Sequence, residues 1–259
     1  MNSAGMRCTQ RKNNDMKMDA SVFPDLDALS RAALGELLVI LRAAVRDRGR
    51  FAIALAGGNT PAGLYRLWAE PQTAAGIPWD RVHFFYGDER YVPPDDPLSN
   101  YRMTRETLIS QVPIPAANVH PVPTTLRPAE KAAEAYEAEL RKFFADASTS
   151  GAPAFDLQLL GLGTEGHTLS LFPGSPVLEE TQRWVAAVEV AAKPPQRVTL
   201  TPVVANQARH TFFLVSGKDK REIVEALRSE PEGQPSRYPA ARIRPAGGVL
   251  WFFDQSAAG

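Results

Sequence analysis

One segment of the chain combines a histidine and a carboxylate in a glycine-rich turn. The sequence LLGLGTEGHTLSLFPGSP, residues 159–176, follows an apolar run and has Glu165 two residues before His167. An imidazole on a loop titrates at about pH 6.5 and can act as a general base or a general acid. A nearby carboxylate can orient the ring and stabilise its protonated form. The segment therefore predicts proton transfer at His167; the alternative is a turn-capping histidine beside a solvated glutamate.

A second polar segment, GDER, stands directly after the apolar run RVHFFY and consists of residues 87–90. Charged side chains at the end of a buried strand cost free energy unless they pair or bind a ligand. We expect Arg90 to meet a substrate phosphate or a developing oxyanion, and Glu89 to hold Arg90. Asp88 is expected near substrate hydroxyls or near His167. The alternative is an ion-paired loop that only orders the residues that follow it.

A third segment, LAGGNTP, has the composition of an anion-binding turn. Two glycines and two polar residues lie between an apolar strand and a helix-forming stretch: Gly57, Gly58, Asn59 and Thr60. Glycines let the backbone approach a ligand closely, and free N–H groups at a helix N-terminus bind phosphate. The segment is neither a Walker A loop nor a G-x-G-x-x-G fingerprint, so a dinucleotide is not indicated. A capped strand-to-helix turn is the alternative.

Two basic residues are candidates for the same phosphate. Arg197 lies in the segment QRVTLTP, and Lys218 follows Gly217 in VSGKDKRE, where a strand is expected to give way to a helix. A guanidinium binds phosphate through two parallel hydrogen bonds, and an ammonium adds a point charge. Ordinary surface charges are the alternative for both residues.

The remaining histidines and the only cysteine do not form a metal-binding pattern. His83 is expected in a sheet, His120 on a loop and His210 at the start of a strand, and Cys8 lies in the polar N-terminal segment. No spacing of these residues is typical of a zinc site, so no metal is expected. With one cysteine no intrachain disulfide can form, which favours a reducing compartment and a cytoplasmic location.

Apolar runs that are typical of buried strands alternate with helical periodicity along most of the chain. Strands are expected within residues 51–58, 81–89, 155–163, 183–190, 197–201, 210–217 and 247–254, and helices within 25–48, 61–70, 100–109, 127–147 and 218–230. This alternation predicts an α/β fold with a mostly parallel sheet covered by helices on both faces. Ligands bind beyond the carboxyl ends of such strands, where several of the polar segments stand.

Composition limits the domain organisation and the partners. Residues 1–20 are expected to form a disordered tail, and residues 21–259 are expected to form one domain. The chain has 29 basic and 29 acidic residues, a balance that argues against nucleic acid and anionic membranes as partners. No apolar run approaches the ~18 residues of a membrane span. A monomer that binds a small molecule is the default expectation.

The order and spacing of five motifs resemble those of 6-phosphogluconolactonases, which share a superfamily with glucosamine- and galactosamine-6-phosphate isomerases. The motifs are LAGGNTP, GDERYVP…SNYRM, GLGTEGHTLSLFPGSP, RVTLTP and SGKDK, and the resemblance extends over residues 23–254. It implies a Rossmann-like α/β fold and a carboxylic ester hydrolase without a cofactor. The implied reaction is hydrolysis of 6-phospho-D-glucono-1,5-lactone, a sugar phosphate, to 6-phospho-D-gluconate in the oxidative pentose phosphate pathway.

The resemblance also implies roles for individual residues. His167 maps to the acid–base histidine and Arg90 to the arginine of GDER, and the phosphate-binding set maps to residues 57–60, Arg197 and Lys218. We expect His167 to activate water for attack on the lactone, because no G-x-S-x-G nucleophile is present. Glu165 stands where the family commonly has aspartate, so its carboxylate is one methylene further from the backbone.

Two other functions would use a similar pocket. A hexosamine-6-phosphate deaminase or isomerase usually continues its GxDGH motif with a segment of the FNEPG kind, whereas this chain has SLFPGSP. A non-catalytic domain that senses sugar phosphates should carry a helix-turn-helix segment, and the N-terminal segment is too short and too polar for one. The sequence therefore favours the lactonase.

Overall fold

The computed structural model describes residues 18–145, 153–230 and 236–259, and two β-sheets organise them. All strands of the large sheet are parallel, in the order β1 (Asp19–Phe23), β9 (Val249–Asp254), β8 (Thr211–Val215), β5 (Leu157–Leu160), β2 (Phe51–Leu55) and β3 (Val82–Tyr86). The small sheet is antiparallel, in the order β4 (Asp88–Arg90), β7 (Gln196–Leu200) and β6 (Val185–Glu189). The predicted α/β fold with a mostly parallel sheet is confirmed.

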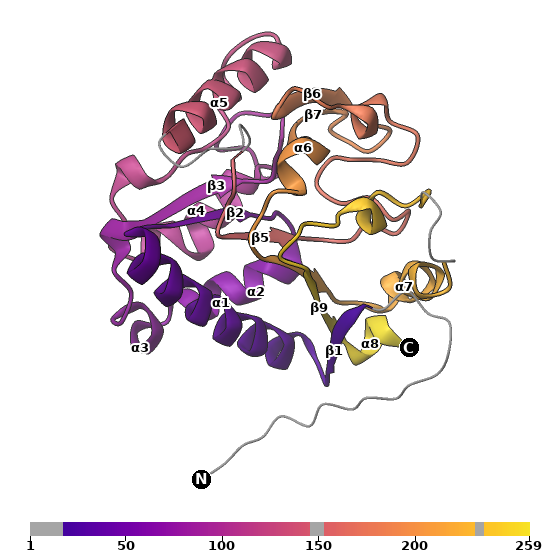
Figure 1. Ribbon diagram of the computed structural model, residues 1–259, viewed down its shortest axis with the longest axis horizontal. Coiled ribbons are helices and arrows are strands. Elements are labelled where there is room, and N and C mark those ends of the chain that lie inside the picture. The colour runs from indigo at the N-terminus through magenta and orange to yellow at the C-terminus, as the bar shows by residue number, and fades with distance from the viewer. Residues whose placement is uncertain (1–17, 146–152, 231–235) are drawn as a thin grey trace.

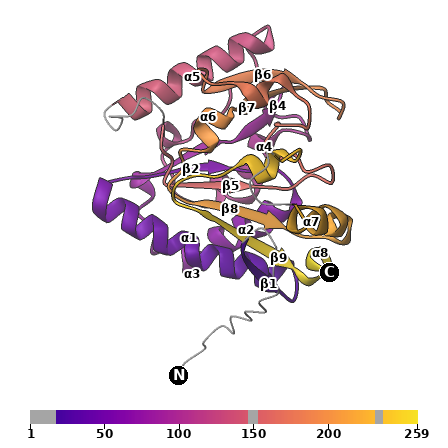
Figure 2. The same ribbon diagram turned by 45° about the vertical axis from the view of Figure 1, so that its right-hand side comes forward.

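Helices lie on both sides of the large sheet (Figures 1 and 2). They are α1 (Leu26–Arg48), α2 (Asn59–Ala69), α3 (Pro71–Ala74), α4 (Asn100–Thr107), α5 (Ala129–Phe144), α6 (Pro202–Ala205), α7 (Arg221–Arg228) and α8 (Gln255–Ala258). Successive side chains of a strand point to opposite faces. In β3, Phe84 packs edge-on against Trp68 of α2, with 5.4 Å between ring centroids, whereas Phe85 contacts Phe143 of α5 at 4.8 Å. The helices α2 and α5 therefore cover opposite faces.

The long helix α1 begins and ends at the residues that its sequence predicts. The carboxylate of Asp25 accepts a hydrogen bond of 2.8 Å from the backbone N–H of Ala28, which is the usual N-cap interaction. Gly49 follows the last helical residue with a φ of 72°, a left-handed conformation that glycine adopts without a steric penalty. The next strand, β2, has five consecutive buried residues, as expected for a parallel strand with both faces covered.

The small sheet is the main refinement of the expected architecture. The segments 183–190 and 197–201 contain strands, as predicted, but these strands pair antiparallel with each other and not with the large sheet. The helix α5 packs on them, and its Glu137 carboxylate accepts hydrogen bonds of 2.8 and 3.1 Å from the backbone N–H groups of Trp184 and Val185. One face of the large sheet is thus covered by a helix together with a second sheet.

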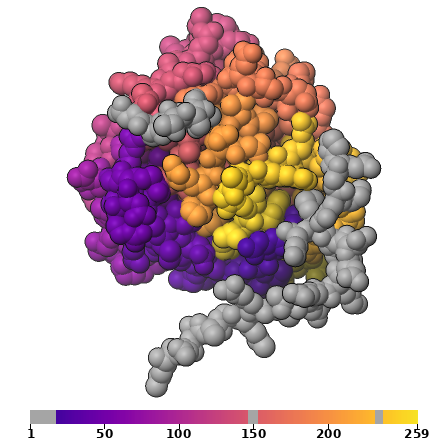
Figure 3. Space-filling view, in the orientation of Figure 1, coloured from indigo at the N-terminus to yellow at the C-terminus, as the bar shows by residue number. Residues whose placement is uncertain are grey.

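The predicted tail over residues 1–20 is wrong at its C-terminal end. Asp19 and Ala20 belong to β1, which pairs parallel with β9 at the edge of the large sheet, whereas residues 1–17 lie outside the described residues. Figure 3 shows the indigo N-terminal part of the described chain beside its yellow C-terminal part. Four of the five residues of β1 are exposed, so no buried apolar run marks this strand in the sequence.

The carboxyl ends of the strands carry the glycine-rich turns. Glycines follow four strands of the large sheet: Gly57 after β2, Gly87 after β3, Gly161 after β5 and Gly217 after β8. Because parallel strands share one direction, these turns meet at the same edge of the sheet. Within the described parts of the chain, no helix has both the length and the apolar character that crossing a membrane requires.

Candidate active site

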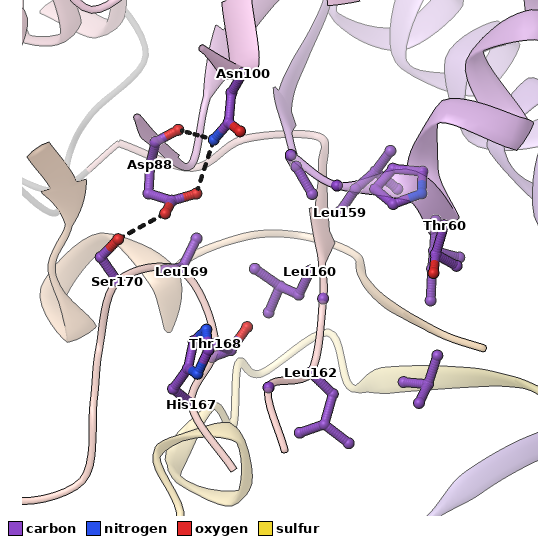
Figure 4. A pocket seen from close by; sticks show the side chains of 18 of the residues that line it. Thr60, Asp88, Asn100, Leu159, Leu160, Leu162, His167, Thr168, Leu169 and Ser170 are labelled. Carbon is purple, nitrogen blue, oxygen red and sulfur yellow. Dashed lines mark hydrogen bonds between the residues drawn. The ribbon is translucent and has the colours of Figure 1, made fainter. Parts of the chain in front are cut away.

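A cleft of about 420 Å³ opens at the carboxyl edge of the large sheet. Its lining includes eight of the ten predicted site residues: Gly57, Gly58, Asn59, Thr60, Asp88, Arg90, His167 and Arg197. Figure 4 shows Asp88, Asn100 and Ser170 gathered on one side of this pocket, across from Thr60, with His167 nearby. The fold therefore brings together three polar segments that are far apart in the sequence, while Glu165 and Lys218 do not line the cleft.

The ring of His167 is held by its own turn. It stacks on Phe172, with 4.0 Å between ring centroids and 15° between planes. The backbone N–H of Gly163 donates a 2.9 Å hydrogen bond to the carbonyl of His167, and a Cβ atom at Gly163 would overlap the imidazole. The glycine in GLG is thus required for the close approach of the ring. Because the ring is wedged between Gly163 and Phe172, its orientation is fixed before a substrate arrives.

The surroundings of His167 favour its neutral form. Burial lowers the pKa of the imidazole, and this effect exceeds the opposing influence of the carboxylates of Glu165 and Asp88. Nδ1 is completely buried and has no hydrogen-bond partner among the described residues, although 26% of the side chain is exposed. The exposed part of the ring is therefore on the side away from Nδ1, where Nε2 lies. A neutral ring with an accessible nitrogen can accept a proton at neutral pH.

Glu165 supports His167 by charge and not by a formed hydrogen bond. Its Oε2 atom lies 3.2 Å from Nδ1 of His167, but the contact lacks hydrogen-bond geometry. The carboxylate is about half exposed, and the hydroxyl of Thr164 donates a 3.2 Å hydrogen bond to it. The longer side chain of glutamate keeps the negative charge beside the imidazole while leaving Nδ1 without an aligned acceptor. Glu165 can thus stabilise an imidazolium from the rim of the cleft.

Asp88 joins two elements of the cleft wall. Its Oδ2 atom accepts a 2.7 Å hydrogen bond from the hydroxyl of Ser170, three residues after His167 (Figure 4). Its backbone carbonyl accepts a 2.9 Å hydrogen bond from the side-chain amide of Asn100. These contacts fix the Asp88 carboxylate between α4 and the loop that carries His167 and Ser170. Asp88 lies close enough to His167 to raise the pKa of the imidazole. The sequence had predicted Asp88 either near substrate hydroxyls or near His167, and this contact agrees with the second alternative.

The guanidinium of Arg90 is held by Asn100 and Leu98 and not by the carboxylate of its neighbour Glu89. The guanidinium of Arg90 donates hydrogen bonds to the side-chain oxygen of Asn100 and, at 3.1 Å, to the carbonyl of Leu98. A Cβ atom at Gly57 would collide with the same side-chain amide of Asn100, so the glycine turn of residues 57–60 packs directly against this group. Asn100 therefore connects Arg90, Asp88 and the glycine turn, a role that the sequence analysis missed.

Glu89 was expected to help hold Arg90, and its carboxylate contacts the backbone of that residue and not the guanidinium. The Glu89 side chain is buried and accepts hydrogen bonds from the backbone N–H groups of Arg90, Asn100 and Tyr101, at 2.7 to 2.8 Å, and from the hydroxyl of Ser99 at 3.1 Å. The N-terminus of a helix presents unpaired N–H groups and partial positive charge, which satisfy a buried carboxylate. Glu89 thus anchors α4 to β4, and α4 in turn positions Arg90.

Arg197 brings an uncompensated charge to the cleft. It lies opposite Arg90 in the β4–β7 pair, is only 6% exposed, and has one guanidinium nitrogen, Nη1, that is buried without a partner in the described residues. Burial lowers the pKa of Arg197, and the adjacent Arg90 lowers it further. A buried donor of this kind is costly unless an acceptor is supplied. Two neighbouring guanidinium groups therefore give this part of the cleft a positive charge that could attract an anion.

The turn before α2 supplies backbone donors. Gly58 is the N-cap residue, with a φ of 102°, and no side chain caps the first turn that Asn59 and Thr60 begin. The N–H groups at the start of this 11-residue helix therefore face the cleft with the positive end of the helix dipole. Gly58 is needed here because residues with a Cβ atom rarely adopt this positive φ. The predicted anion-binding turn is at the cleft, as expected.

Lys220, two residues after the predicted Lys218, is the lysine that lines the cleft. The segment 218–220 forms a single 3-10 turn after Gly217, and this turn leaves Lys218 exposed outside the pocket. The ammonium of Lys220 lies 3.0 Å from the Asp219 carboxylate. The motif SGKDK contains both lysines, so spacing from the glycine alone did not distinguish them. Ser170 lies in the motif GLGTEGHTLSLFPGSP and Asn100 in SNYRM, but the sequence predicted no role for either residue.

Metal ligands do not gather at this site. Among residues 18–145, 153–230 and 236–259, no group of three or more histidine, cysteine, aspartate or glutamate side chains could hold a metal ion. The described lining of the cleft offers an imidazole that can transfer a proton, at His167. It also offers cationic or N–H groups that can attract an anion: Arg90, Arg197, Lys220 and the first turn of α2.

Comparison with known proteins gives a consistent result. Residues 24–251 match the family described as "Glucosamine-6-phosphate isomerases/6-phosphogluconolactonase". A 6-phosphogluconolactonase of Synechocystis is 44% identical, over 83% of this chain and 86% of the relative. A 6-phosphogluconolactonase of Mycobacterium tuberculosis is 40% identical, over 94% of this chain and 98% of the relative.

Solved structures agree with the fold. The 6-phosphogluconolactonase of Trypanosoma cruzi superposes with a TM-score of 0.82 at 31% identity, and the match covers 95% of this chain and 98% of that one. A monomeric glucosamine-6-phosphate deaminase superposes with a TM-score of 0.74 at 21% identity, over 93% of this chain and 99% of that one. At that identity the second likeness speaks for the fold alone.

Proposed function

The chain belongs to the family of glucosamine-6-phosphate isomerases and 6-phosphogluconolactonases, and we propose that it hydrolyses 6-phospho-D-glucono-1,5-lactone with His167 as the general base. The product is 6-phospho-D-gluconate, which belongs to the oxidative pentose phosphate pathway. One observation carries the proposal: a neutral, accessible imidazole shares a cleft with a buried arginine that forms no ion pair with a described residue. The monomeric state and the cytoplasmic location expected from the sequence stay predictions.

The positive part of the cleft binds the phosphate of the substrate. The guanidinium of Arg197, the ammonium of Lys220 and the N–H groups at the start of α2 together offer charge and directional donors. A phosphate dianion in the cleft would offset the positive charge of Arg197, a buried guanidinium that forms no ion pair with a described residue. The phosphate is attached through C6 to C5, which is bonded to the same ring oxygen as the carbonyl carbon C1. Binding the phosphate therefore fixes the position of the lactone carbonyl relative to His167.

Hydrolysis begins with proton transfer to His167. Nε2 of the neutral ring removes a proton from a water molecule while the water oxygen forms a bond to C1 of the lactone. The electrons of the carbonyl double bond move to oxygen and form an oxyanion. The carboxylates of Glu165 and Asp88 stabilise the imidazolium that results. Burial of the ring lowers the pKa of His167, and the two carboxylates raise it. Because these effects oppose each other, the imidazole can both accept and return a proton.

The second step opens the ring. The oxyanion re-forms the carbonyl, the bond between C1 and the ring oxygen breaks, and the imidazolium returns its proton to that oxygen. Arg90 is the donor that we assign to the oxyanion, because Asn100 and Leu98 fix its guanidinium at the cleft. Asp88 accepts hydrogen bonds from substrate hydroxyls. The atoms balance as lactone plus water to hydroxy acid, which ionises to the carboxylate.

The decisive experiment follows acid release from freshly prepared 6-phosphogluconolactone. The spontaneous opening of the lactone is subtracted, and unphosphorylated gluconolactone is the matched substrate. We expect rapid hydrolysis of the phosphorylated lactone only. Ammonia release from glucosamine 6-phosphate would instead indicate a deaminase, and tight sugar-phosphate binding without turnover would indicate a sensing domain. Either result contradicts the proposal.

A further inference from the structure

A second cleft, of about 620 Å³, lies at the amino edge of the large sheet, opposite the candidate active site. It is lined by four arginines: Arg48, Arg50, Arg81 and Arg209. Arg50 precedes β2, Arg81 precedes β3 and Arg209 lies two residues before β8. Because these strands are parallel, the residues that precede them share one edge, just as the residues that follow them form the active-site cleft.

Asp156 organises two of these arginines. Its carboxylate is buried, and Oδ2 accepts a 2.8 Å hydrogen bond from the backbone N–H of Ala52. The other oxygen, Oδ1, accepts a 2.8 Å hydrogen bond from Nε of Arg48 and lies 3.7 Å from Nε of Arg209. One buried carboxylate therefore draws two guanidinium groups together. It cannot neutralise both, so a positive charge remains between them.

Arg50 forms a rigid wall of the same cleft. Its guanidinium lies 4.1 Å above the ring of Phe143 and donates a 3.1 Å hydrogen bond to the carbonyl of that residue. The remaining arginine, Arg81, is more exposed and pairs with Asp80 at 3.2 Å. His83 also lines the cleft, and burial, His120 and Arg50 lower its pKa to about 4, so it adds no charge at neutral pH.

The charges that line this cleft do not balance. Among the described residues that line the cleft, four guanidinium groups face the carboxylates of Asp80 and Asp156, so two positive charges are in excess. Guanidinium groups that converge in a concave site suit an anion with several acceptor oxygens, because their donors lie in a planar fork. The volume is in the range of small-molecule pockets, roughly 300–1,000 Å³, and is too small for a folded partner.

We propose that the amino-edge cleft is a binding site for a small, multiply charged anion of the phosphate-bearing class, separate from the active site. Arg48 and Arg209, drawn together by Asp156, would bind one phosphate through their free donors, and Arg50 and Arg81 would close the site from β2 and β3. The proposal does not depend on lactone hydrolysis, because none of these residues lines the catalytic cleft.

Calorimetric titration with inorganic pyrophosphate tests this site. Arg81→Ala and Arg209→Ala should each weaken pyrophosphate binding by about tenfold, because each removes a charge-assisted contact. The matched control is Arg31→Ala on α1: the Arg31 side chain has the same exposed fraction as that of Arg81, 59%, and pairs with Asp27 as Arg81 pairs with Asp80. Any pyrophosphate that binds to Arg90 and Arg197 in the catalytic cleft contributes equally in all these proteins, because neither residue is changed.

The control should bind pyrophosphate like the unmodified chain. Equal affinity in all four proteins would overturn the proposal, and so would a loss in Arg31→Ala as large as in the cleft variants. If Arg209→Ala unfolds because Asp156 loses a partner, Arg81→Ala alone decides the result, since Arg81 pairs with no described carboxylate other than the exposed Asp80. Circular dichroism and the rate of lactone hydrolysis verify that each variant is folded.

Discussion

The two edges of the large sheet are built on the same strands but differ in how their polar groups are satisfied. At the carboxyl edge the chain turns at glycines, and the cleft has free helix N–H groups and a buried guanidinium nitrogen without a partner. At the amino edge the arginines have carboxylate or carbonyl partners. Catalysis requires groups that are held rigidly yet left for the substrate to satisfy. Among the described residues, the carboxyl edge combines such groups with the accessible imidazole of His167, whereas the imidazole of the amino-edge cleft, His83, contacts His120 at 3.3 Å.

Two buried histidines show the same contrast. Burial lowers the pKa of both His167 and His120, and each has a carboxylate nearby. The ring of His120 stacks on Phe85, and its nitrogens contact Glu139 at 2.9 Å and His83 at 3.3 Å, so both are occupied. His167 instead has a buried Nδ1 without a hydrogen bond and an exposed opposite side. Availability of a nitrogen, more than the pKa, separates a base from a structural histidine.

Replacing His167 should have the largest effect. His167→Ala removes the general base, and we expect kcat for lactone hydrolysis to fall by about 10²–10⁴ after background subtraction. His120→Ala is the matched control, because it removes a half-buried histidine next to a carboxylate outside the catalytic cleft. It should lower the melting temperature and leave kcat nearly unchanged. Equal losses in the two variants would remove His167 from the mechanism.

The two guanidinium groups of the cleft should separate into a catalytic and a binding effect. Arg90→Ala removes the proposed oxyanion donor, and we expect kcat to fall by ~10²–10³. Arg197→Ala removes a contact to the phosphate, which is the same in substrate and transition state, so it should mainly raise KM. Steady-state kinetics on the phosphorylated lactone measure both. The opposite pattern would exchange the two roles.

Asn100 should matter through the residues that it positions. Asn100→Ala frees the guanidinium of Arg90 and the Asp88 loop, and loss of alignment should reduce kcat by roughly 10–10². The control is Asn118→Ala: Asn118 is also buried, and its amide donates a 3.1 Å hydrogen bond to the carbonyl of Asp80 near the amino edge. Both variants should lose some stability, measured by thermal melting. A comparable loss of kcat in Asn118→Ala would mean that Asn100 acts only through stability.

The pH dependence of the reaction should report the environment of His167. The base must be neutral, and burial shifts its pKa below the ordinary 6.5, so the acid limb of kcat/KM should be centred below pH 6.5. Glu165→Ala removes a carboxylate that raises this pKa, and the acid limb should move further down. Glu165→Asp keeps the charge and should largely restore the profile. An acid limb centred above pH 6.5 would contradict the neutral-base assignment.

The sequence predicted the site best where chemistry and backbone geometry coincide. Gly57, Gly58 and His167 were found because glycines at strand ends and a histidine beside a carboxylate are local signals. The role of Glu89 was misjudged because the N-terminus of α4, which it caps, comes close only in the fold. Asn100 was missed for a similar reason, since its contacts to Gly57 and Asp88 join separate segments.

The parallel strands of the fold were predictable from the sequence, whereas the start of the edge strand and the separate small sheet were not. Continuous apolar runs such as that of β2 marked the parallel strands, because both of their faces are buried. The edge strand β1 is mostly exposed and has no such run, so its first two residues, Asp19 and Ala20, were assigned to a tail. The separate antiparallel sheet depends on which strands pair. Residue types indicate that a segment forms a strand, but they do not indicate its partner strand, which is set by the tertiary structure.

The smallest expected effect distinguishes two lysines in one motif. Lys220 lines the cleft and Lys218 does not, although the sequence favoured Lys218. Lys220→Ala should raise KM about threefold to fivefold with little change in kcat, because an ammonium paired with Asp219 and partly exposed to water contributes at most ~1 kcal/mol. Lys218→Ala is the matched control and should leave both constants unchanged. Because the attraction to phosphate is screened by ions, the KM effect should shrink as salt is added. If Lys218→Ala raised KM instead, the 3-10 turn after Gly217 would have to be oriented differently when substrate is bound, with Lys218 and not Lys220 reaching the phosphate.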